Sequence, residues 1–476
     1  MTEPLLQELS APGRPTIPIS GAPAGAPPLD IPAALLRSEL PLPEVGEPEV
    51  VRHFTRLSRQ NMSIDTTFYP LGSCTMKYNP KVNDAMATLP GMRNIHPLQP
   101  LETVQGALEL VYELQEALAR LTGFDEVSLV GAAGAQGELA GLLMIRAAHE
   151  AHGAHGRRRV LIPDSAHGTN PATAAMAGYE VVTLKSDSRG NVDLASLKSL
   201  VGEDTAALMI TVPSTLGLFD EAMLEVSAIV HEAGAYVYGD GANLNALLGV
   251  ARPRDLGIDV MHANLHKTFT TPHGGGGPGA CGIGATAALA PYLPGPMVAR
   301  RSDGRFTLDI ERPHSIGRLL AFQGHFGMLV RAYTYLRMLG SPGLREVAEA
   351  AVLNANYLRQ RLISAYQPAY DRWCMHEAVF AGTRSGAART IDVAKRLLDF
   401  GFHPPTIYFP LIVPEALMIE PTETESRATL DAFADALLRI AEEAERDPEL
   451  LRSAPHDTPV GRLDETTAAR NPVLHW

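Results

Sequence analysis

Cysteine is scarce in this sequence, and its scarcity excludes two kinds of protein. Only Cys74, Cys281 and Cys374 occur, far apart and without C-x-x-C spacing. Three scattered thiols form neither a disulfide framework nor a zinc ribbon, and this usage is typical of a reducing compartment. We therefore expect a cytoplasmic protein.

Long apolar runs and basic blocks are also missing. No stretch approaches the roughly 18 consecutive apolar residues of a membrane-spanning helix. The N-terminus, MTEPLLQELSAPGRP, has neither the basic nor the apolar region of a secretory signal. Lys and Arg total 40 against 53 Asp and Glu, a net charge of -13 without a basic cluster that would neutralise phosphates. These absences predict an unsecreted protein that binds neither membrane nor nucleic acid.

The composition is that of a folded protein of several domains. The chain has 476 residues, 45% hydrophobic and 20% charged, and domains hold about 150 residues each. Residues 1 to about 48 are crowded with Pro, Gly and Ala, which predicts an extended arm. We divide the chain into the arm with an entrance segment (1–100), a large domain (101–330) and a small α+β domain (331–476).

Apolar periodicity changes from helical to strand-like after Gly123. A stripe at helical spacing over 101–121 predicts a long amphipathic helix that Gly123 ends. Beyond it, short apolar runs alternate with helical segments, and the runs are EVSLV, RVLIP, YEVVTL, AALMITV and AYVYGD. This alternation predicts βα units and a mostly parallel sheet. Because ligands of such sheets bind beyond the carboxyl ends of the strands, the loops after these runs are the candidate site.

From about Val330 helices alternate with short strands. The segment IDVAKRLLDFG predicts a helix that ends at Gly401, and TIYFPLIV and ALMIEP predict strands. Thr422 is followed three residues later by Glu425, a capping box that predicts the start of the last helix.

Three glycine-rich segments match known sites by letter pattern. Gly131–Gly137 joins a strand to a helix and lacks the lysine of a Walker loop; it is either a phosphate cradle or a structural turn. Gly277–Gly282 fits G-x-G-x-x-G, but Pro278 interrupts it and no strand opens directly into a helix, so we reject a dinucleotide site. Pro272–Gly277 is similar to the oxyanion loop of esterases, but a G-x-S-x-G nucleophile is missing, so we reject a hydrolase.

A cluster of histidines near residue 270 suggests a metal. His262, His266 and His273 lie near Cys281, and the first two are four residues apart. The intervening sequence lacks the glutamate of a metalloprotease motif, and its strand-like context does not place both rings on one helix face. We predict no metal site.

Lys267 and Asp240 point to another chemistry. Pyridoxal phosphate (PLP) requires an amine, a carboxylate that keeps its ring nitrogen protonated, a phosphate cradle and a flat group against the ring. The candidates for these tasks are Lys267, Asp240, the turn of Gly134, Ala135 and Gln136, and His167. Alone, Lys267 could be a surface charge and His167 a turn residue, but their conjunction favours PLP.

Eight segments between Gln60 and Ser426 together resemble one family. They are YPLGSCTMKYNP, GAAGAQGELAGLL, DSAHGTNPATAAMAG, VPSTLGLFD, YGDGANLNA, NLHKTFTTPHGGGGPGACGIG, AKRLLDFGFHPPT and MIEPTETES. They are similar to the PLP-dependent P-protein, glycine decarboxylase, of the glycine cleavage system, and match the PLP-bearing half, which is a separate subunit in some organisms. The resemblance implies an α/β PLP-dependent transferase fold of type I, aspartate aminotransferase-like, with a large, mostly parallel sheet domain and a smaller α+β domain.

The resemblance also implies roles for single residues. It places the Schiff-base lysine on Lys267, the ring-nitrogen partner on Asp240 and the stacking histidine on His167, and these three are the catalytic candidates. The implied cofactor pocket adds Gly134, Ala135, Gln136, Thr215, Asn243 and His266. Arg384 and Arg389 are the candidates for binding the substrate carboxylate.

The implied reaction is that of a glycine dehydrogenase (aminomethyl-transferring). Glycine loses CO2 on PLP, and the aminomethyl group passes to the lipoyl arm of H-protein. The implied partners are a companion P-protein subunit, wrapped by the arm in an α2β2 heterotetramer, and lipoylated H-protein. Two alternatives stay open: another fold type I decarboxylase or lyase, and a non-catalytic scaffold subunit, which would lack Lys267.

The segment Thr66–Pro80 is rich in hydroxyls and aromatics and resembles the family closely. We expect Tyr69–Lys77 to form a wall of the active-site entrance. Cys74 is interpreted as a buried small residue rather than a nucleophile.

Overall fold

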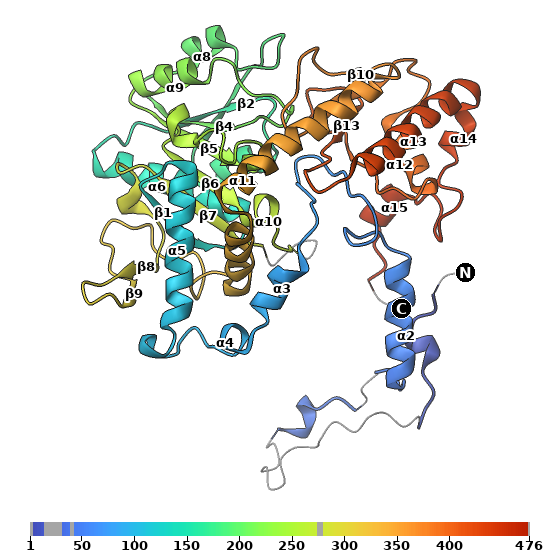
Figure 1. Ribbon diagram of the computed structural model, residues 1–476, viewed down its shortest axis with the longest axis horizontal. Coiled ribbons are helices and arrows are strands. Elements are labelled where there is room, and N and C mark those ends of the chain that lie inside the picture. The colour runs from blue at the N-terminus through green and yellow to red at the C-terminus, as the bar shows by residue number, and fades with distance from the viewer. Residues whose placement is uncertain (1–2, 14–30, 39–41, 274–278, 475–476) are drawn as a thin grey trace.

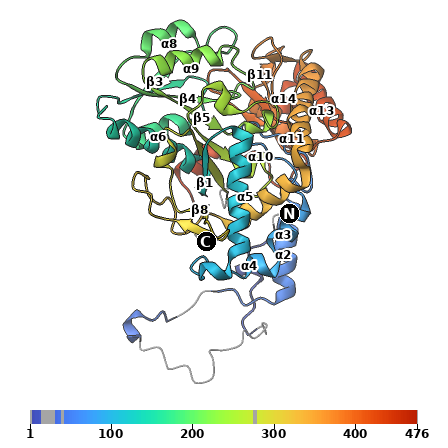
Figure 2. The same ribbon diagram turned by 60° about the vertical axis from the view of Figure 1, so that its left-hand side comes forward.

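The computed structural model describes residues 3–13, 31–38, 42–273 and 279–474. A large body is built on a central sheet, a smaller C-terminal part lies beside it, and the N-terminal segment extends away from both (Figures 1 and 2). The strands are β1 (Glu126–Gly131), β2 (Arg159–Pro163), β3 (Glu180–Leu184), β4 (Thr205–Thr211), β5 (Tyr236–Gly241), β6 (Val260–Asn264), β7 (Cys281–Ala285), β8 (Met297–Arg300), β9 (Phe306–Asp309), β10 (Tyr366–Pro368), β11 (Ala378–Thr383), β12 (Thr406–Ile407) and β13 (Ala416–Ile419).

Helices cover the sheets and connect them. They are α1 (Leu6–Leu9), α2 (Glu47–Arg59), α3 (Lys81–Ala87), α4 (Pro90–Arg93), α5 (Gln105–Thr122), α6 (Gly134–Ala151), α7 (Thr169–Met176), α8 (Leu194–Leu200), α9 (Met223–Glu232), α10 (Leu265–Thr268), α11 (Phe326–Leu362), α12 (Thr390–Asp399), α13 (Arg427–Arg446), α14 (Pro448–Arg452) and α15 (Glu465–Arg470). Among the described residues, no helix is both long and apolar enough to cross a membrane.

The central sheet has seven strands in the order β1-β7-β6-β5-β4-β2-β3. The pairs from β6 through β3 are parallel, whereas β7 runs antiparallel to both of its neighbours. Each of the five apolar runs forms a strand of this sheet. The inner strands β2, β4 and β5 are buried along almost their whole length, as continuous apolar sequence predicts for strands covered on both faces. The sequence analysis did not predict β7, whose residues CGIGA carry little β propensity.

Helices pack on both faces of this sheet. Along β4, Leu208 and Ile210 join one apolar core, while Ala207 and Met209 join the core of the opposite face. This alternation is the two-residue period of a strand, and it places α5, α9 and α11 on one side and α6 and α7 on the other. The helix predicted over 101–121 is α5, which begins at Gln105 and ends before the left-handed Gly123.

The smaller part of the chain is built on an antiparallel sheet in the order β10-β11-β13-β12. Helices α12 and α13 cover it, together with the C-terminal half of α11. Helix α11 is interrupted at Gly340, which has a φ of 62°. Its side chains join the large core up to Ala348 and the small core from Ala355. The domain boundary placed at 330 stays a prediction.

Two local predictions in this part are wrong. Thr422 does not cap a helix, since it has a left-handed φ of 61° and its hydroxyl accepts the N–H of Thr424. The true cap is Ser426, whose hydroxyl accepts the N–H of Thr429 at the start of α13, and α14 and α15 follow that helix. The strand predicted over 406–413 ends at Ile407, because Tyr408 turns the chain with a φ of 59°.

Two segments from the sequence analysis lie partly outside the described residues. The Pro-rich arm is described only at 3–13, 31–38 and from 42 on, where α1 and then α2 form. The rejected patterns at Pro272–Gly277 and Gly277–Gly282 include 274–278, which the structure does not describe.

Close packing of α6 on β5 generates a stability prediction. A Cβ at Gly141 of α6 would lie 2.3 Å from the fully buried ring of Tyr238, whereas a Cβ at Gly106 of α5 would meet nothing within 4 Å. We expect Gly141→Ala to lower the free energy of unfolding by about 1–3 kcal/mol. The matched Gly106→Ala should leave it unchanged or raise it by up to about 1 kcal/mol. Chemical unfolding of both variants would measure this difference, and equal midpoints would contradict the packing described.

Candidate active site

The predicted site residues converge on one edge of the central sheet. Strands β1, β5 and β6 end there, and the turn into α6 and the turn containing Lys267 follow directly. Because parallel strands end at the same edge, residues more than a hundred positions apart in sequence become neighbours. Asp240 lies in register with His262 of β6 and Thr211 of β4.

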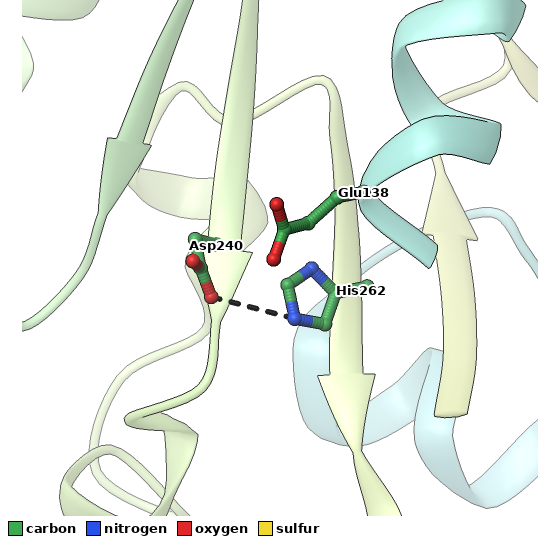
Figure 3. A group of neighbouring side chains, drawn as sticks. All are labelled: Glu138, Asp240 and His262. Carbon is green, nitrogen blue, oxygen red and sulfur yellow. Dashed lines mark ion pairs between the residues drawn. The ribbon is translucent and has the colours of Figure 1, made fainter. Parts of the chain in front are cut away.

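Asp240 is buried in a polar network beneath this edge. Its Oδ1 accepts the N–H of Ala242 at 2.9 Å and lies 3.4 Å from Nε2 of His262, and its Oδ2 accepts Nδ2 of Asn170 at 3.0 Å. Figure 3 shows Asp240 and His262 facing one another, with Glu138 of α6 beside them. The hydroxyl of Tyr238 bonds the other ring nitrogen of His262 at 2.6 Å. The imidazole is therefore held in place at both of its nitrogens.

Glu138 is a second buried carboxylate in this network. Its oxygens accept hydrogen bonds from Thr169 (2.9 Å), Asn170 (3.1 Å) and Thr173 (3.2 Å) of α7. Asn170 thus donates from one amide nitrogen to Glu138 and to Asp240. This shared donor links the two carboxylates, and charge-assisted hydrogen bonds of this kind are about twice as strong as neutral ones.

The environment favours the ionised form of Asp240. Burial alone would raise its pKa, but His262, the Asn170 amide and Lys267 lower it, and the net pKa lies below the usual value. A carboxylate that stays charged in a buried position can hold a cation or a proton on a ligand above it. Asp240 is the carboxylate of the site that best meets this requirement.

Lys267 lies on α10, one turn after β6. Its Nζ donates to the carbonyl of Ser73 at 2.9 Å. The charge of Lys267 also contributes to the lowered pKa values of Asp240 and, after burial, of His167. The lysine therefore lies within electrostatic range of both residues.

The turn into α6 presents backbone N–H groups. No side chain caps this helix at Ala133. A Cβ at Gly134 would lie 2.5 Å from Oδ1 of Asn264, so only glycine fits. Ala135 is exposed, and Gln136 accepts the N–H of Ala132 at 2.8 Å and donates to the carbonyl of Leu319 at 3.2 Å. The side chain of Gln136 thus braces the turn in this structure.

The remaining predicted pocket residues surround the same edge. Nδ1 of His167 bonds the hydroxyl of Thr169 at 2.8 Å. The hydroxyl of Thr215 donates to the carbonyl of Ser165. Asn243 donates to the carbonyl of Pro213 at 2.9 Å, and its Oδ1 is buried without a partner among the described residues. Burial, then Lys267, lowers the pKa of His266 to about 4.

The two candidate arginines have other partners. Arg384 donates to the carbonyl of Ile363 and to Gln367, and Arg389 donates to the hydroxyl of Tyr408. Both arginines are exposed. Their role in carboxylate binding stays a prediction.

The histidine cluster near residue 270 is divided among three surroundings. His262 belongs to the Asp240 network, His266 and His273 lie edge to face with ring centroids 5.7 Å apart, and Cys281 is buried in β7. A Cβ on Gly131 would lie 2.1 Å from the sulfur of Cys281, so the thiol occupies the space beside this glycine.

The sequence analysis missed the polar groups that support the predicted ones. It read His262 only as a metal ligand, and it assigned nothing to Glu138 or Asn170. The signal was present, since Glu138 lies one turn into the helix after the glycine turn and Asn170 follows His167 by three residues. The motifs MIEPTETES and YPLGSCTMKYNP contain Glu420 and Ser73, for which the sequence predicted no role.

The segment 71–77 is part of the molecule's interior. Leu71 forms a bridge with Ile419 of β13, and the carbonyl of Gly72 accepts the hydroxyl of Thr406. The ammonium of Lys77 is buried between Glu423 (2.8 Å) and Asn245 (2.7 Å). Cys74 is half-buried rather than buried, and burial raises the pKa of its thiol.

Comparisons with known proteins agree with one another. The family described as "Glycine cleavage system P-protein" matches residues 29–311, and "Glycine dehydrogenase, C-terminal domain" matches residues 347–456. The chain is 56% identical over 462 residues to a probable glycine dehydrogenase (decarboxylating) subunit 2 of Caldanaerobacter subterraneus subsp. tengcongensis, covering 94% of this chain and 95% of that protein. It is 57% identical over 477 residues to the protein of the same name in Halalkalibacterium halodurans, covering 99% and 98%.

Solved structures share the fold. A glycine decarboxylase (P-protein) of the glycine cleavage system, in inhibitor-bound form, has a TM-score of 0.74 at 24% identity and covers 86% of this chain and 93% of that one. A glutamate decarboxylase of Lactobacillus brevis has a TM-score of 0.65 at 14% identity, covering 87% and 96%. The predicted PLP fold of type I is confirmed. By its sequence along nearly its whole length, the chain belongs to the P-protein family of the glycine cleavage system.

Proposed function

We propose that this chain is the PLP-bearing subunit of a glycine decarboxylase, a glycine dehydrogenase (decarboxylating), and that Lys267 holds the cofactor. One observation carries the assignment of residues. The amine of Lys267, the ionised carboxylate of Asp240 and the uncapped start of α6 lie at one edge of the sheet, and hydrogen bonds hold the lysine and the aspartate there. A scaffold subunit would need none of these groups.

The residues at this edge fit the cofactor. The N-terminus of α6, a helix of 18 residues, has backbone N–H groups without a side-chain cap, which suits a phosphate. Oδ1 of Asn243 and the hydroxyl of Thr268 are buried without partners among the described residues, so polar groups remain available to a ligand. The ionised Asp240 suits a protonated ring nitrogen.

The side chains have separate tasks in this proposal. When bound, PLP supplies an electron sink for the pair that remains on glycine after CO2 leaves. Lys267 binds the cofactor through its amine and accepts or returns a proton there. Asp240 holds a proton on the ring nitrogen, and His262 and Asn170 keep that carboxylate ionised and oriented. Gly134, Ala135 and Gln136 bind the phosphate, and His167 is the candidate for contact with the ring.

Subunit 2 in the names of the relatives implies a companion chain. Helix α2 offers it a surface. Val51, Phe54 and Leu57 are exposed at helical spacing, and the segment lies outside the main body (Figure 1). Glu3 forms ion pairs with Arg56 and His53 of the same helix. An exposed apolar stripe on an ordered helix favours burial against a partner.

The assembly, the acceptor protein and the cellular location are also part of the proposal. The companion and this chain form an α2β2 heterotetramer, and lipoylated H-protein receives the aminomethyl group. The free thiols of Cys74, Cys281 and Cys374 favour the cytoplasm, since they form no disulfide.

The role of Lys267 generates the first functional prediction. Lys267→Ala should abolish the visible absorbance that PLP acquires when an amine of the protein binds it, because no other amine replaces this one. Lys267→Arg keeps the charge beside Ser73 and should also lose the absorbance. Spectra of both variants with added PLP, followed by borohydride reduction, would test this. A reducible adduct that persists in either variant would overturn the assignment.

Asp240 should affect chemistry more than cofactor binding. Asp240→Asn retains the shape but removes the charge, and we expect exchange of the glycine carboxyl with labelled CO2 to fall by at least about a hundredfold while PLP still binds. Asp259→Asn is a matched control, because Asp259 also bonds a histidine, His231 at 2.8 Å, but precedes β6 at the other edge. Exchange by Asp240→Asn at the level of this control would contradict the proposal.

The companion should be required for activity. We expect this chain alone to lack glycine–CO2 exchange with H-protein and to gain it when the companion is added. Phe54→Ser should weaken binding of the companion at least about tenfold, whereas Leu224→Ser, at another exposed apolar residue on α9, should not. Light scattering and titration of the companion measure both effects. Full activity of this chain alone as a homodimer would refute the requirement.

A further inference from the structure

Two glutamates lie opposite one another under the segment that contacts Lys267. Strands β11 and β13 pair antiparallel with Ala378 opposite Ile419, so Glu377 and Glu420 are the next pair of facing residues. Both are fully buried. Like charges directly opposite in a sheet are destabilising, and burial makes two such charges costlier still.

Each glutamate uses one oxygen to hold the same short loop. Oε2 of Glu377 accepts the N–H of Ser73 at 2.7 Å, and Oε2 of Glu420 accepts the N–H of Thr75 at 3.0 Å. Ser73 and Thr75 have left-handed φ values of 64° and 34°, a conformation that non-glycine residues rarely adopt. The carbonyl of Ser73 in turn accepts Nζ of Lys267. The pair therefore acts on Lys267 through this loop.

The other oxygen of each glutamate is left over. Oε1 of Glu377 and Oε1 of Glu420 are buried, and neither has a hydrogen-bond partner among the described residues. One oxygen of each carboxyl and a ring nitrogen of His376 lie within 4.8 Å of one another, and Nε2 of His376 is 3.6 Å from Oε1 of Glu377. A proton on one carboxyl would turn it into a donor toward the other. A single proton would thus supply the missing partner for both oxygens.

We propose that Glu377 and Glu420 share one proton and, as a pair, position Lys267 by holding the Ser73–Thr75 loop. The inference rests on the proposed role of Lys267. It adds two positioning residues from the C-terminal part of the chain to a site whose other groups come from the large sheet. The carboxyls keep the amine of Lys267 at a fixed place without contacting the reacting atoms.

The surrounding charges agree with a shared proton. Burial raises the pKa of Glu420 to about 7. Burial and Glu420 hold the pKa of Glu377 well above its usual range. Lys267 faces both carboxyls, and Lys77 also faces Glu420. The nearby Cys74 thiol has a raised pKa, and burial, then Lys267, lowers the pKa of His376 to about 3, so neither supplies a charge at neutral pH.

The sign of the pH dependence follows from this pair. With the loop closed, Glu420 keeps its proton up to about pH 7, whereas an opened, hydrated loop would return it toward 4.5. Between these values the closed state binds more protons, so rising pH favours opening, and above about 7 the effect levels off. From pH 6 to pH 8, the opening equilibrium should increase about tenfold.

Hydrogen exchange at Ser73 and Thr75 tests the proposal, because these amides make the two bonds. In the full chain without PLP, we expect their protection, corrected for the chemical exchange rate, to fall about tenfold from pH 6 to pH 8. In Glu420→Gln the group whose pKa is about 7 is gone, so the tenfold fall in protection between pH 6 and pH 8 should be lost. Glu415→Gln is the matched control, because Glu415 also accepts a backbone N–H, that of Thr390, away from the pair. It should behave as the wild type.

Three results would overturn the proposal. One is the same pH dependence in Glu420→Gln as in the wild type, and another is one bound metal ion per wild-type chain that Glu420→Gln lacks. If the variant does not fold, infrared difference spectra of the wild type decide, because a carboxylic acid band must disappear between pH 6 and pH 8. The third contradicting result is a spectrum in which no carboxylic acid band disappears over this range. None of these measurements requires PLP. Failure of the Lys267 adduct would instead refute the proposed function.

Discussion

The structure of the site depends on keeping one buried carboxylate charged. Asp240 lies inside the protein at the end of β5, where burial opposes ionisation, and His262 and Asn170 offset that cost. These supports require α6 to lie very close to the sheet. Added Cβ atoms at Gly137 and Gly141 of this helix would lie 2.7 Å from His262 and 2.3 Å from Tyr238. Gly137 and Gly141 therefore serve this network, because they let α6 approach His262 and Tyr238 closely.

The site is assembled from three parts of the chain that are distant in sequence. The sheet supplies Asp240 and the α6 turn, the segment 71–77 covers Lys267, and β11 and β13 hold that segment from below. Segment 71–77 packs with little tolerance, since a Cβ on Gly72 would lie 2.1 Å from the side chain of Met418. A residue of the C-terminal sheet can consequently affect Lys267 without contacting it.

Sequence reasoning found the elements whose signal is local. The apolar runs predicted β2, β4 and β5, because a strand that is buried on both faces consists of consecutive apolar residues. The helical spacing of apolar residues predicted α5, because a helix that is buried along one stripe repeats them every three or four positions. It failed where tertiary contacts decide. Strand β7 is glycine-rich because Gly284 faces Phe124 and leaves no space for a side chain. The Thr422 cap failed because that residue is held in a left-handed turn beside Glu420 and Glu423. The supports of Asp240 could not be ranked from sequence, since their distances arise only from the register of β5 on β6.

The acidic residues of the site differ in the protonation state that their surroundings favour. Asp240 faces an imidazole and an amide donor, so its pKa falls. Burial raises the pKa values of Glu377 and Glu420, and Glu420 raises that of Glu377 further, although the same lysine lies near all three acidic residues. Environments that shift the pKa values of neighbouring acidic groups in opposite directions leave one group charged and another protonated at the same pH. Asp240 is suited to stabilise positive charge on a ligand, whereas the glutamate pair is suited to retain a proton and hold the backbone beside Lys267. Exchanging these environments would place a repelling pair of charges near Lys267 and would leave Asp240 protonated and unable to stabilise positive charge on a ligand.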